Sequence, residues 1–245
     1  GDRITVRRLL DHTAGLYNYT NDWMDENGVN LPALLASGAR PIPPAEVVAG
    51  AVARPVNFAP GESLAYDNTG YLLAGMVVEA AGGRAYEDHI TDRILRPLGL
   101  NQTVVRMSSE LPEPHAHGYL MQHDLTTFDR TAAGSAGGIV STAGDVNRFF
   151  AGLLRGDLLG AAELTEMLAP TPWRDPAFRA GLGMIGMTLD GGVDVIGKDG
   201  DFLGYDTWSF HTFAGDRQLT LSVTTSCDIS FDTAQILARF GYVLL

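Results

Sequence analysis

The sequence predicts an α+β fold, because helical periodicity comes first along the chain and strand alternation follows. Before residue 180 the apolar residues recur at helical spacing, whereas after Gly181 they alternate with polar residues. No internal repeat is present. We therefore expect a mostly helical region over residues 1–180, followed by antiparallel strands covered by a C-terminal helix over 181–245, together forming one domain.

The first helix is expected near residues 4–12, with Thr5 as its N-cap and Gly15 just past its end. A loop rich in aromatic and amide side chains follows over residues 16–23. Such a loop either lines a pocket or packs its rings beneath the surface. The paired prolines at 43–44 begin a second helix, since proline is tolerated in a first helical turn.

The stretch from Phe58 to Gly83 has the most informative pattern in the first half of the chain. A Pro-Gly turn leads into Tyr66-Asp67-Asn68, and an apolar helix is expected directly behind it, over about 69–81, ended by a pair of glycines. A phenol and a carboxamide two residues apart at the start of a rigid helix are groups that a reaction site uses. The alternative interpretation is a capped helix with a surface tyrosine.

Further helices are expected on both sides of an irregular region. Residues 86–95 have helical spacing, and 101–130 have prolines, polar residues and little periodicity. A segment of small residues then leads to a helix over 143–154. Thr142 would cap this helix, with Asp145 as the acid of a capping box.

The last part of the chain is expected to form an antiparallel sheet. Apolar and polar residues alternate between Tyr205 and Phe213, and the turn at 214–217 makes a hairpin with the next strand. A helix over 231–242 would cover this sheet. The expected elements before it are a helix over 161–168 and strands over 182–189, 193–196, 205–213 and 219–223.

Charge and cysteine content exclude several classes of function. The formal net charge is −12 and no cluster of Lys and Arg is present, which argues against a nucleic-acid partner. No apolar run reaches the length of a membrane span. Cys227 is the only cysteine, so neither an internal disulfide nor a cysteine metal cage can form, and His115, His117 and His123 lack the spacing of a helical metal site. We expect no cofactor and no metal.

Lysine occurs once in the chain, because the 17 basic residues are sixteen arginines and Lys198. Burial or a like charge can lower the pKa of a lysine, whereas arginine stays protonated. Lys198 stands in the segment Gly197-Lys198-Asp199-Gly200-Asp201, between the strands expected to contain Val195 and Trp208. The lone amine is either retained for a function or a matter of chance.

Tyr66-x-Asn68 and Lys198-x-Gly200 resemble two of the three motifs of the serine penicillin-recognising enzymes. The Tyr-x-Asn form is that of the class C β-lactamase and D-alanyl-D-alanine carboxypeptidase branch. The resemblance covers essentially the whole chain and implies the β-lactamase/transpeptidase-like fold. Further segments that resemble the family are 4–7, 12–17, 60–62, 138–142 with Asp145, and 197–204.

This resemblance implies acyl transfer through a covalent serine ester. Tyr66 would act as general base and then as general acid, its pKa lowered by the ammonium of Lys198 and of an upstream lysine. Asn68 would orient the substrate carbonyl or that lysine. The oxyanion hole would use the backbone N–H of Asp201 together with that of the serine. The resemblance places the substrate-binding and oxyanion residues at Asp199, Gly200 and Asp201.

The chain departs from the family pattern in having no Ser-x-x-Lys motif, since Val195 stands three places before its only lysine. In the family this motif lies upstream of the position that corresponds to Gly1. We therefore expect the nucleophile on an N-terminal segment that precedes these residues, or on a second chain that completes the fold. Any signal peptide would also lie upstream, because the start of the sequence is charged.

A second departure concerns Asp199 and Asp201, which stand where carboxypeptidase relatives usually have hydroxyl residues that help to bind a C-terminal carboxylate. Two acids there would repel a carboxylate. This favours an ester, an amide or a peptide that presents an amine as the small-molecule or peptide substrate. The alternative is that one or both side chains point away from the pocket.

Two functions remain open at this point. The first is a serine hydrolase or acyltransferase that acts on a peptide, amide, ester or β-lactam, and the groups of Tyr66, Asn68 and Lys198 favour it. The second is a non-catalytic acyl- or peptide-binding relative of the same fold, which the absent serine favours. The resemblance is closest to secreted bacterial carboxypeptidases and so implies a secreted or cell-envelope location.

Overall fold

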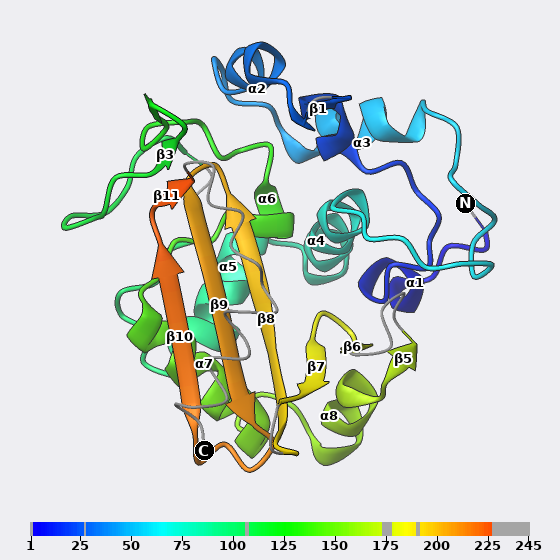
Figure 1. Cartoon of the computed structure of the whole chain (residues 1–245). Helices are drawn as coiled ribbons and strands as arrows, with labels where there is room; N and C mark the ends of the chain where they lie inside the picture. The colour runs from blue at the N-terminus through cyan, green and yellow to red at the C-terminus, as the bar shows by residue number, and fades with distance from the viewer. Residues whose placement is uncertain (1, 27, 106–107, 173–177, 190–191, 227–245) are drawn as a thin grey trace. The chain divides into compact units, whose positions relative to one another are not determined.

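The computed structural model describes residues 2–26, 28–105, 108–172, 178–189 and 192–226. Helices precede an antiparallel sheet, which confirms the predicted α+β class (Figure 1). The helix expected over 231–242 and Cys227 lie outside the described residues. Two compact units divide the chain: unit 1 comprises residues 1–91, 104–113 and 127–140, and unit 2 comprises residues 92–103, 114–126 and 141–245.

Unit 1 is built from helices and begins with α1 (Val6–Leu10). Thr5 caps α1 as predicted, because its Oγ1 accepts a hydrogen bond from the backbone N–H of Arg8 at 3.3 Å. The helix ends earlier than Gly15, since His12 has a left-handed backbone with φ of 59°. The other elements of unit 1 are α2 (Leu31–Ser37), α3 (Pro44–Val52), α4 (Thr69–Gly82), α5 (Tyr86–Ile90), α6 (Gly134–Gly137), a 3₁₀ helix (Tyr19–Trp23) and the strands β1 (Met24–Asp25) and β2 (Gly28–Val29).

Helix α4 is the central element of unit 1 and confirms the helix predicted over 69–81. It ends where Gly83 takes a left-handed backbone with φ of 66°. Its Leu72 is fully buried and packs in a core cluster with Tyr19, Val48 and Ala51. Helix α4, which follows the motif Tyr66-x-Asn68, is thereby packed on the same apolar core as α3 and the 3₁₀ helix.

Unit 2 contains a six-stranded antiparallel sheet with the strand order β10-β9-β8-β7-β6-β5 (Figure 1). Helix α7 packs on β9 and β10, which gives the sheet one helix-covered face. The predicted division of the chain into a helical region before residue 180 and a strand region after it stays a prediction. Helices α7 and α8 precede residue 180 and belong to unit 2. The bounds are α7 (Ala143–Arg155), α8 (Ala161–Leu168), β5 (Thr171–Pro172), β6 (Phe178–Ala180), β7 (Ile185–Thr188), β8 (Asp194–Phe202), β9 (Tyr205–Thr212) and β10 (Gln218–Val223).

A small sheet interrupts the region 101–130, which was predicted to be irregular. The strands β3 (Tyr119–Leu120) and β4 (His123–Asp124) form a hairpin, and β3 also pairs with β11 (Thr225–Ser226). Strands of two residues show no periodicity in a sequence, so this hairpin was missed. The predicted helix over 86–95 is α5 followed by a π-helical turn over Thr91–Leu95.

Strand β8 is longer than the strand predicted over 193–196, and this changes the setting of the Lys-x-Gly motif. Leu203 and Gly204 both have positive φ, 49° and 92°, and form a two-residue turn that pairs Phe202 with Tyr205. The pairing continues back along the hairpin to Val195. The prediction that the motif connects two strands was therefore wrong, because Lys198 lies within β8.

The two faces of the sheet have separate apolar clusters. Val195, Trp208 and Phe210 belong to one cluster, whereas Ile196 packs with Phe150 and other residues of a second cluster. His211, opposite Ile196 in the register, is fully buried with its ring 4.6 Å from that of Phe150. Strand alternation places Lys198 on the same face as Ile196.

Asp145 connects α7 to a segment about forty residues earlier in the chain. In a capping box its side chain would instead bind the backbone at Thr142. Thr142 Oγ1 accepts the backbone N–H of Asp145 at 3.3 Å, as predicted. The Asp145 side chain, however, is fully buried and accepts hydrogen bonds from the Gln102 backbone N–H at 2.9 Å and from Thr103 Oγ1 at 2.8 Å. Its carboxylate thus satisfies donors of another segment.

We expect Asp145→Ala to lower the free energy of unfolding of the full-length protein by about 3 kcal/mol, since it leaves donors around a buried carboxylate unpaired. Asp157→Ala is the matched control, because this exposed carboxylate pairs only at the surface, with Arg155 at 2.6 Å, and should cost less than about 1 kcal/mol. Urea denaturation measures both. Equal losses would contradict the structural role of Asp145.

Candidate functional site

Tyr66 and Asn68 form the first part of the candidate site, in unit 1. The Tyr66 hydroxyl donates a hydrogen bond to Asn68 Oδ1 at 3.1 Å. The side chain of Tyr66 is 46% exposed, so its phenol is accessible from solvent. The structure therefore brings together the two side chains that the sequence singled out, at the beginning of α4.

The loop over residues 16–23 holds Asn68 in place. Asn18 Oδ1 accepts the backbone N–H of Asn68 at 3.1 Å and its side-chain Nδ2 at 3.4 Å, and Nδ2 also donates to Thr20 Oγ1 at 3.4 Å. Tyr19, between them, is buried in the core. The predicted packing of the loop's rings beneath the surface is thus confirmed at Tyr19, whereas the lining of a pocket by this loop stays a prediction. Asn18 and Thr20 were missed as individual residues, since nothing in an amide-rich loop distinguishes one polar residue from the next.

Asp67 lies beneath the pair and caps α4. Its side chain is 1% exposed, and Oδ1 accepts the backbone N–H of Gly70 at 2.5 Å. The other oxygen, Oδ2, is buried without a hydrogen-bond partner. Burial raises the pKa of Asp67 to about 6, and the backbone N–H groups of Gly70 and Thr69 oppose this shift. Asp67 rather than Asn68 therefore supplies the side-chain cap.

His12 packs against the phenol of Tyr66. Their ring centroids lie 4.5 Å apart, and the His12 ring is also 5.2 Å from that of Tyr71. His12 Nδ1 accepts the backbone N–H of Asp67 at 3.3 Å. The buried His12 imidazole thus contacts both the ring of Tyr66 and the backbone N–H of Asp67. Its role was not predicted, although a polar residue two places after a helix end is a common site of such contacts.

Lys198 belongs to the second part of the candidate site, in unit 2. Its ammonium Nζ lies 2.6 Å from Asp199 Oδ1 and donates to the Asp199 carbonyl at 2.8 Å. The Asp199 side chain is therefore directed toward the amine. Apart from the neighbours of Gly200 in the chain, no described residue lies within 4 Å of the position that a Cβ would take there.

In the described part of the chain, no strand pairs with β8 beside Lys198 on the edge away from β9. Strand β7 pairs with β8 only as far as Gly197, and the register with β9 continues to Phe202. Among the described residues, the segment from Lys198 to Phe202 is thus bordered by a strand on one side only. Backbone N–H groups on an unpaired edge can bind a substrate strand or a developing oxyanion. The setting fits the role expected of the Asp201 N–H.

Three carboxyl groups gather along this hairpin. Asp199 and Asp201 are two residues apart on β8, and Asp201 pairs across the strands with Asp206. Burial, and then the charge of Asp199, raises the pKa of Asp201. Burial, and then the charge of Asp201, raises the pKa of Asp206 to about 6. Asp206 was missed, although the two-residue turn at Leu203-Gly204 would have placed it opposite Asp201.

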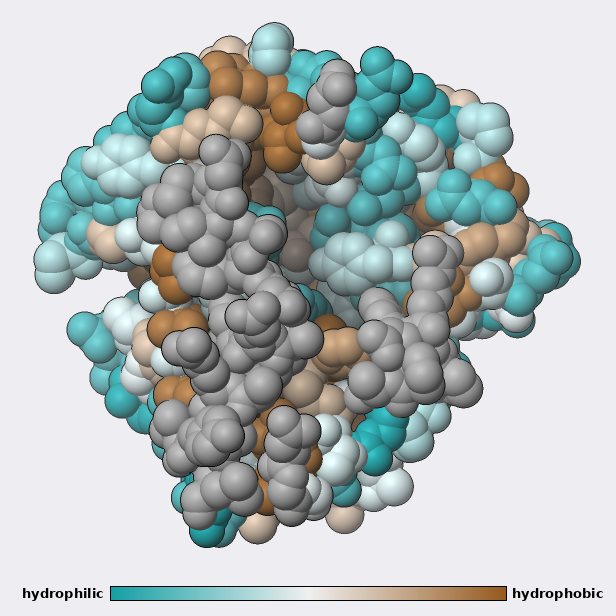
Figure 2. All heavy atoms as spheres, in the orientation of Figure 1, coloured by the Kyte–Doolittle hydropathy of each residue, from teal (hydrophilic) through white to brown (hydrophobic). Residues whose placement is uncertain are grey.

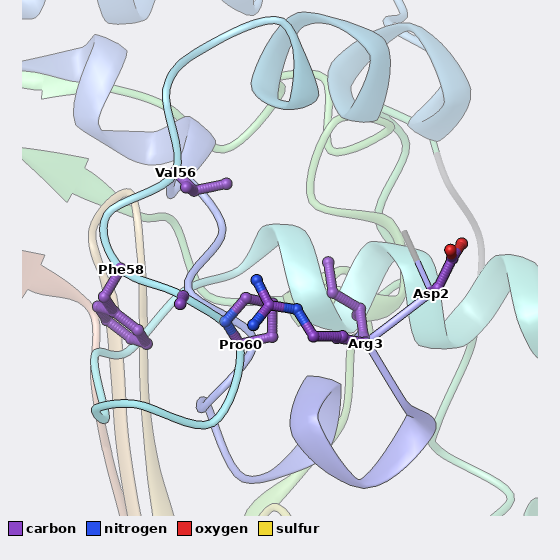
Figure 3. Close-up of a pocket in the computed structure, with 7 residues that line it drawn as sticks. Asp2, Arg3, Val56, Phe58 and Pro60 are labelled. Atoms are coloured by element: carbon purple, nitrogen blue, oxygen red, sulfur yellow. The ribbon is translucent and has the colours of Figure 1, made fainter.

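One pocket in unit 1 is lined by none of these residues. This pocket of about 620 Å³ is lined by residues before α1 and after α3, among them Arg3, which extends toward Pro60, and Asp2, which points away (Figure 3). On the face shown in Figure 2, the coloured apolar residues form small groups between hydrophilic ones. In the described ranges, no three His, Cys, Asp or Glu residues are arranged to hold a metal ion. The described helices include none with the length and hydropathy needed to cross a membrane.

Comparison with known proteins shows the family of the chain. The family model described as Beta-lactamase matches residues 1–240. Penicillin-binding protein 4* of Bacillus subtilis (strain 168) is 32% identical over 128 residues, which are 51% of this chain and 27% of that protein. The chain thus matches about a quarter of the length of this relative.

Solved structures extend the likeness over nearly the whole chain. A D-stereospecific amidohydrolase from Streptomyces sp. superposes with a TM-score of 0.84 and 34% identity, covering 91% of this chain and 68% of that one. A D-amino acid amidase from Ochrobactrum anthropi SV3 superposes with a TM-score of 0.81 and 27% identity, covering 99% and 70%. Because the family model matches residues 1–240, the chain belongs to the Beta-lactamase family, whose members are serine hydrolases.

Proposed function

We propose that the protein hydrolyses an amide or ester of a D-amino acid that carries a free amine, through a covalent serine ester. The observation that carries this proposal is that Tyr66 is 46% exposed and that its hydroxyl is held 3.1 Å from Asn68 Oδ1 at the start of α4. An accessible phenol fixed beside a carboxamide suits proton transfer at a substrate carbonyl. Membership of a serine hydrolase family and the similarity to two D-specific amidases support the same chemistry.

In this mechanism the nucleophile is the serine of a Ser-x-x-Lys segment that residues 1–245 do not contain. Its hydroxyl oxygen bonds to the substrate carbonyl carbon while Tyr66, as phenolate, takes the proton. The carbon–nitrogen bond then breaks, and the leaving amine receives that proton from Tyr66. Water repeats the sequence on the ester, which releases the acid and restores the serine. The Asp201 N–H and the serine N–H would bind the oxyanion.

The charge of the β8–β9 hairpin supports a substrate with an amine rather than a free carboxylate. Asp199, Asp201 and Asp206 already disfavour one another's ionised forms, as the raised pKa values of the last two indicate. A substrate carboxylate would add a fourth negative charge, whereas an ammonium would relieve the repulsion. Lys198 does not offset all three groups, because its ammonium pairs with Asp199.

Three substrates test this proposal on the full-length protein: D-phenylalanine amide, N-acetyl-D-phenylalanine amide and the dipeptide D-alanyl-D-alanine. We expect kcat/KM to be highest for the free-amine amide, lower by about tenfold without the ammonium, and lowest for the dipeptide with its carboxylate. L-Phenylalanine amide is the control for stereospecificity. Preference for the dipeptide would refute the proposed substrate class.

The same protein distinguishes a hydrolase from a binding relative. Intact-mass measurement after exposure to an activated D-amino-acid ester is expected to show an added acyl group, because a covalent adduct requires a nucleophile. Binding of the substrate by calorimetry without adduct or turnover would instead favour the non-catalytic relative.

A further inference from the structure

Asp67 is a buried carboxyl group next to Tyr66 that the proposed mechanism does not use. It is 1% exposed and lies between the start of α4 and the residues that follow α1, two helices that pack on each other in unit 1. Its backbone N–H donates to His12 Nδ1 at 3.3 Å, and its neighbour Tyr66 packs on the same imidazole. Asp67 is thus fixed both through its side chain and through its backbone.

The cap that Asp67 provides does not require a charge. Its Oδ1 accepts the Gly70 N–H at 2.5 Å, a bond that serine, with a neutral hydroxyl, commonly makes at the start of a helix. The second oxygen, Oδ2, is buried and has no hydrogen-bond partner. A carboxylate in such a place is costly for the fold. The cap alone therefore does not account for a carboxyl group at this position.

The titratable groups described around Asp67 and Tyr66 in unit 1 include a carboxyl group, an imidazole and two phenols. Asp11 and His12 face them from the segment after α1, Tyr19 from the 3₁₀ helix and Tyr71 from α4. Burial, and then the charges of Tyr66, Asp11 and Asp67, raise the pKa of Tyr71. His12 Nδ1 accepts the backbone N–H of Asp67 and is thus directed at the peptide rather than at the Asp67 carboxyl group.

We propose that Asp67 is a positioning residue that fixes the start of α4 and, when ionised, opposes ionisation of the Tyr66 phenol, so that its charge sets the pH range in which Tyr66 accepts a proton. A buried negative charge one residue away disfavours a phenolate more than it would in water. Removal of the charge should make Tyr66 a base at lower pH. The catalytic consequence rests on the proposed function, whereas the effect on the phenol does not.

Asp67→Asn in the full-length protein is expected to lower the titration midpoint of Tyr66 by about one pH unit. The Cζ signal of Tyr66 in a ¹³C-tyrosine-labelled sample reports this midpoint, and Tyr66→Phe assigns the signal. The acid limb of the kcat/KM profile should move in the same direction by the same amount. Asp67→Ser, which keeps a side-chain cap, should give the same shift if Asp67→Asn folds poorly. Glu79→Gln removes one charge at the other end of α4 and should shift neither quantity.

An unchanged Tyr66 midpoint in both Asp67 variants would overturn the proposal, whatever their activity. A shifted midpoint with a pH profile that does not move would support the effect on the phenol and refute Tyr66 as the catalytic base. Stability provides an independent check. Because burial raises the pKa of Asp67 from 3.8 to about 6, the wild type gains stability as pH falls through that range, and Asp67→Asn should melt higher than the wild type at pH 8 but not at pH 4.

Discussion

Tyr66→Phe is expected to lower the rate of acylation of the full-length protein by about 10³-fold, within the range that general acid–base groups contribute. The substitution removes only the hydroxyl oxygen, so the packing of the ring on His12 at 4.5 Å should persist. What is lost is the acceptor of the serine proton and the donor to the leaving amine. Stopped-flow measurement of acyl-enzyme formation with an activated D-amino-acid ester separates this step from deacylation.

Tyr17→Phe is the matched control for this change. The Tyr17 hydroxyl contacts Asp22 at 2.8 Å in the same unit and makes no contact with Asn68, so its loss should change acylation less than twofold. Substrate affinity should change little in Tyr66→Phe, because a proton-transfer group acts on kcat more than on KM. Acylation at the wild-type rate in Tyr66→Phe would remove Tyr66 from the mechanism, and another base would be required.

The sequence predicted those elements whose signal is local. Helix α4 has a long apolar run behind a Pro-Gly turn and a glycine stop, and α7 begins at a threonine cap, so both were placed correctly. The hairpin of β9 and β10 follows from alternation and a turn. In each case propensity, periodicity and capping indicate one structure, which makes such segments readable from residues alone.

Features that depend on tertiary pairing were not predicted. The extension of β8 through Lys198 has no apolar alternation of its own, since it depends on pairing with β9. Asp145 matches a capping box in sequence, yet its carboxylate binds Gln102 and Thr103, which stand more than forty positions earlier in the chain. His12 became part of the site because its left-handed backbone directs it against the start of α4.

The sequence predicted which side chains of the candidate site lie together, but not which of the residues around them are buried. Tyr66 and Asn68 were expected to lie together and do. No role was predicted for Asp67, which lies between them in the sequence, because the burial of a polar side chain at a helix start cannot be inferred from the sequence. The roles of Tyr66, Asn68, Lys198, Gly200 and Asp201 remain predictions that the experiments above test.

Substitution of Asp199 and Asp201 by serine is expected to change the substrate preference of the protein by about 100-fold. Each carboxylate that is removed alters the interaction with a charged substrate group by about 1–1.5 kcal/mol in a partly exposed site, or about tenfold. The kcat/KM ratio of D-phenylalanine amide to D-alanyl-D-alanine should therefore fall by this amount. Both substrates carry an ammonium group, so the change in the ratio comes from the lost repulsion of the dipeptide's carboxylate.

Loss of the ion pair between Lys198 and Asp199 should strengthen the change. In the wild type the Lys198 ammonium is 2.6 Å from Asp199 Oδ1, and removal of that carboxylate lowers the negative charge that opposes attraction between this ammonium and a substrate carboxylate. Lower repulsion along the hairpin should also bring the pKa of Asp206, now raised to about 6 by burial and by Asp201, closer to its ordinary value. NMR titration of the Asp206 carboxyl carbon can follow this shift independently of turnover.

Asp157→Asn with Asp216→Asn is the control pair, since it removes the same two charges from exposed positions of unit 2 that lie at the end of α7 and in the turn before β10. This pair should leave the substrate ratio within twofold of the wild type. If it changes the ratio as much as the serine pair does, the preference comes from the net charge of the protein and not from the hairpin. If neither pair changes it, Asp199 and Asp201 do not face the substrate, and the expected preference for an amine has another cause.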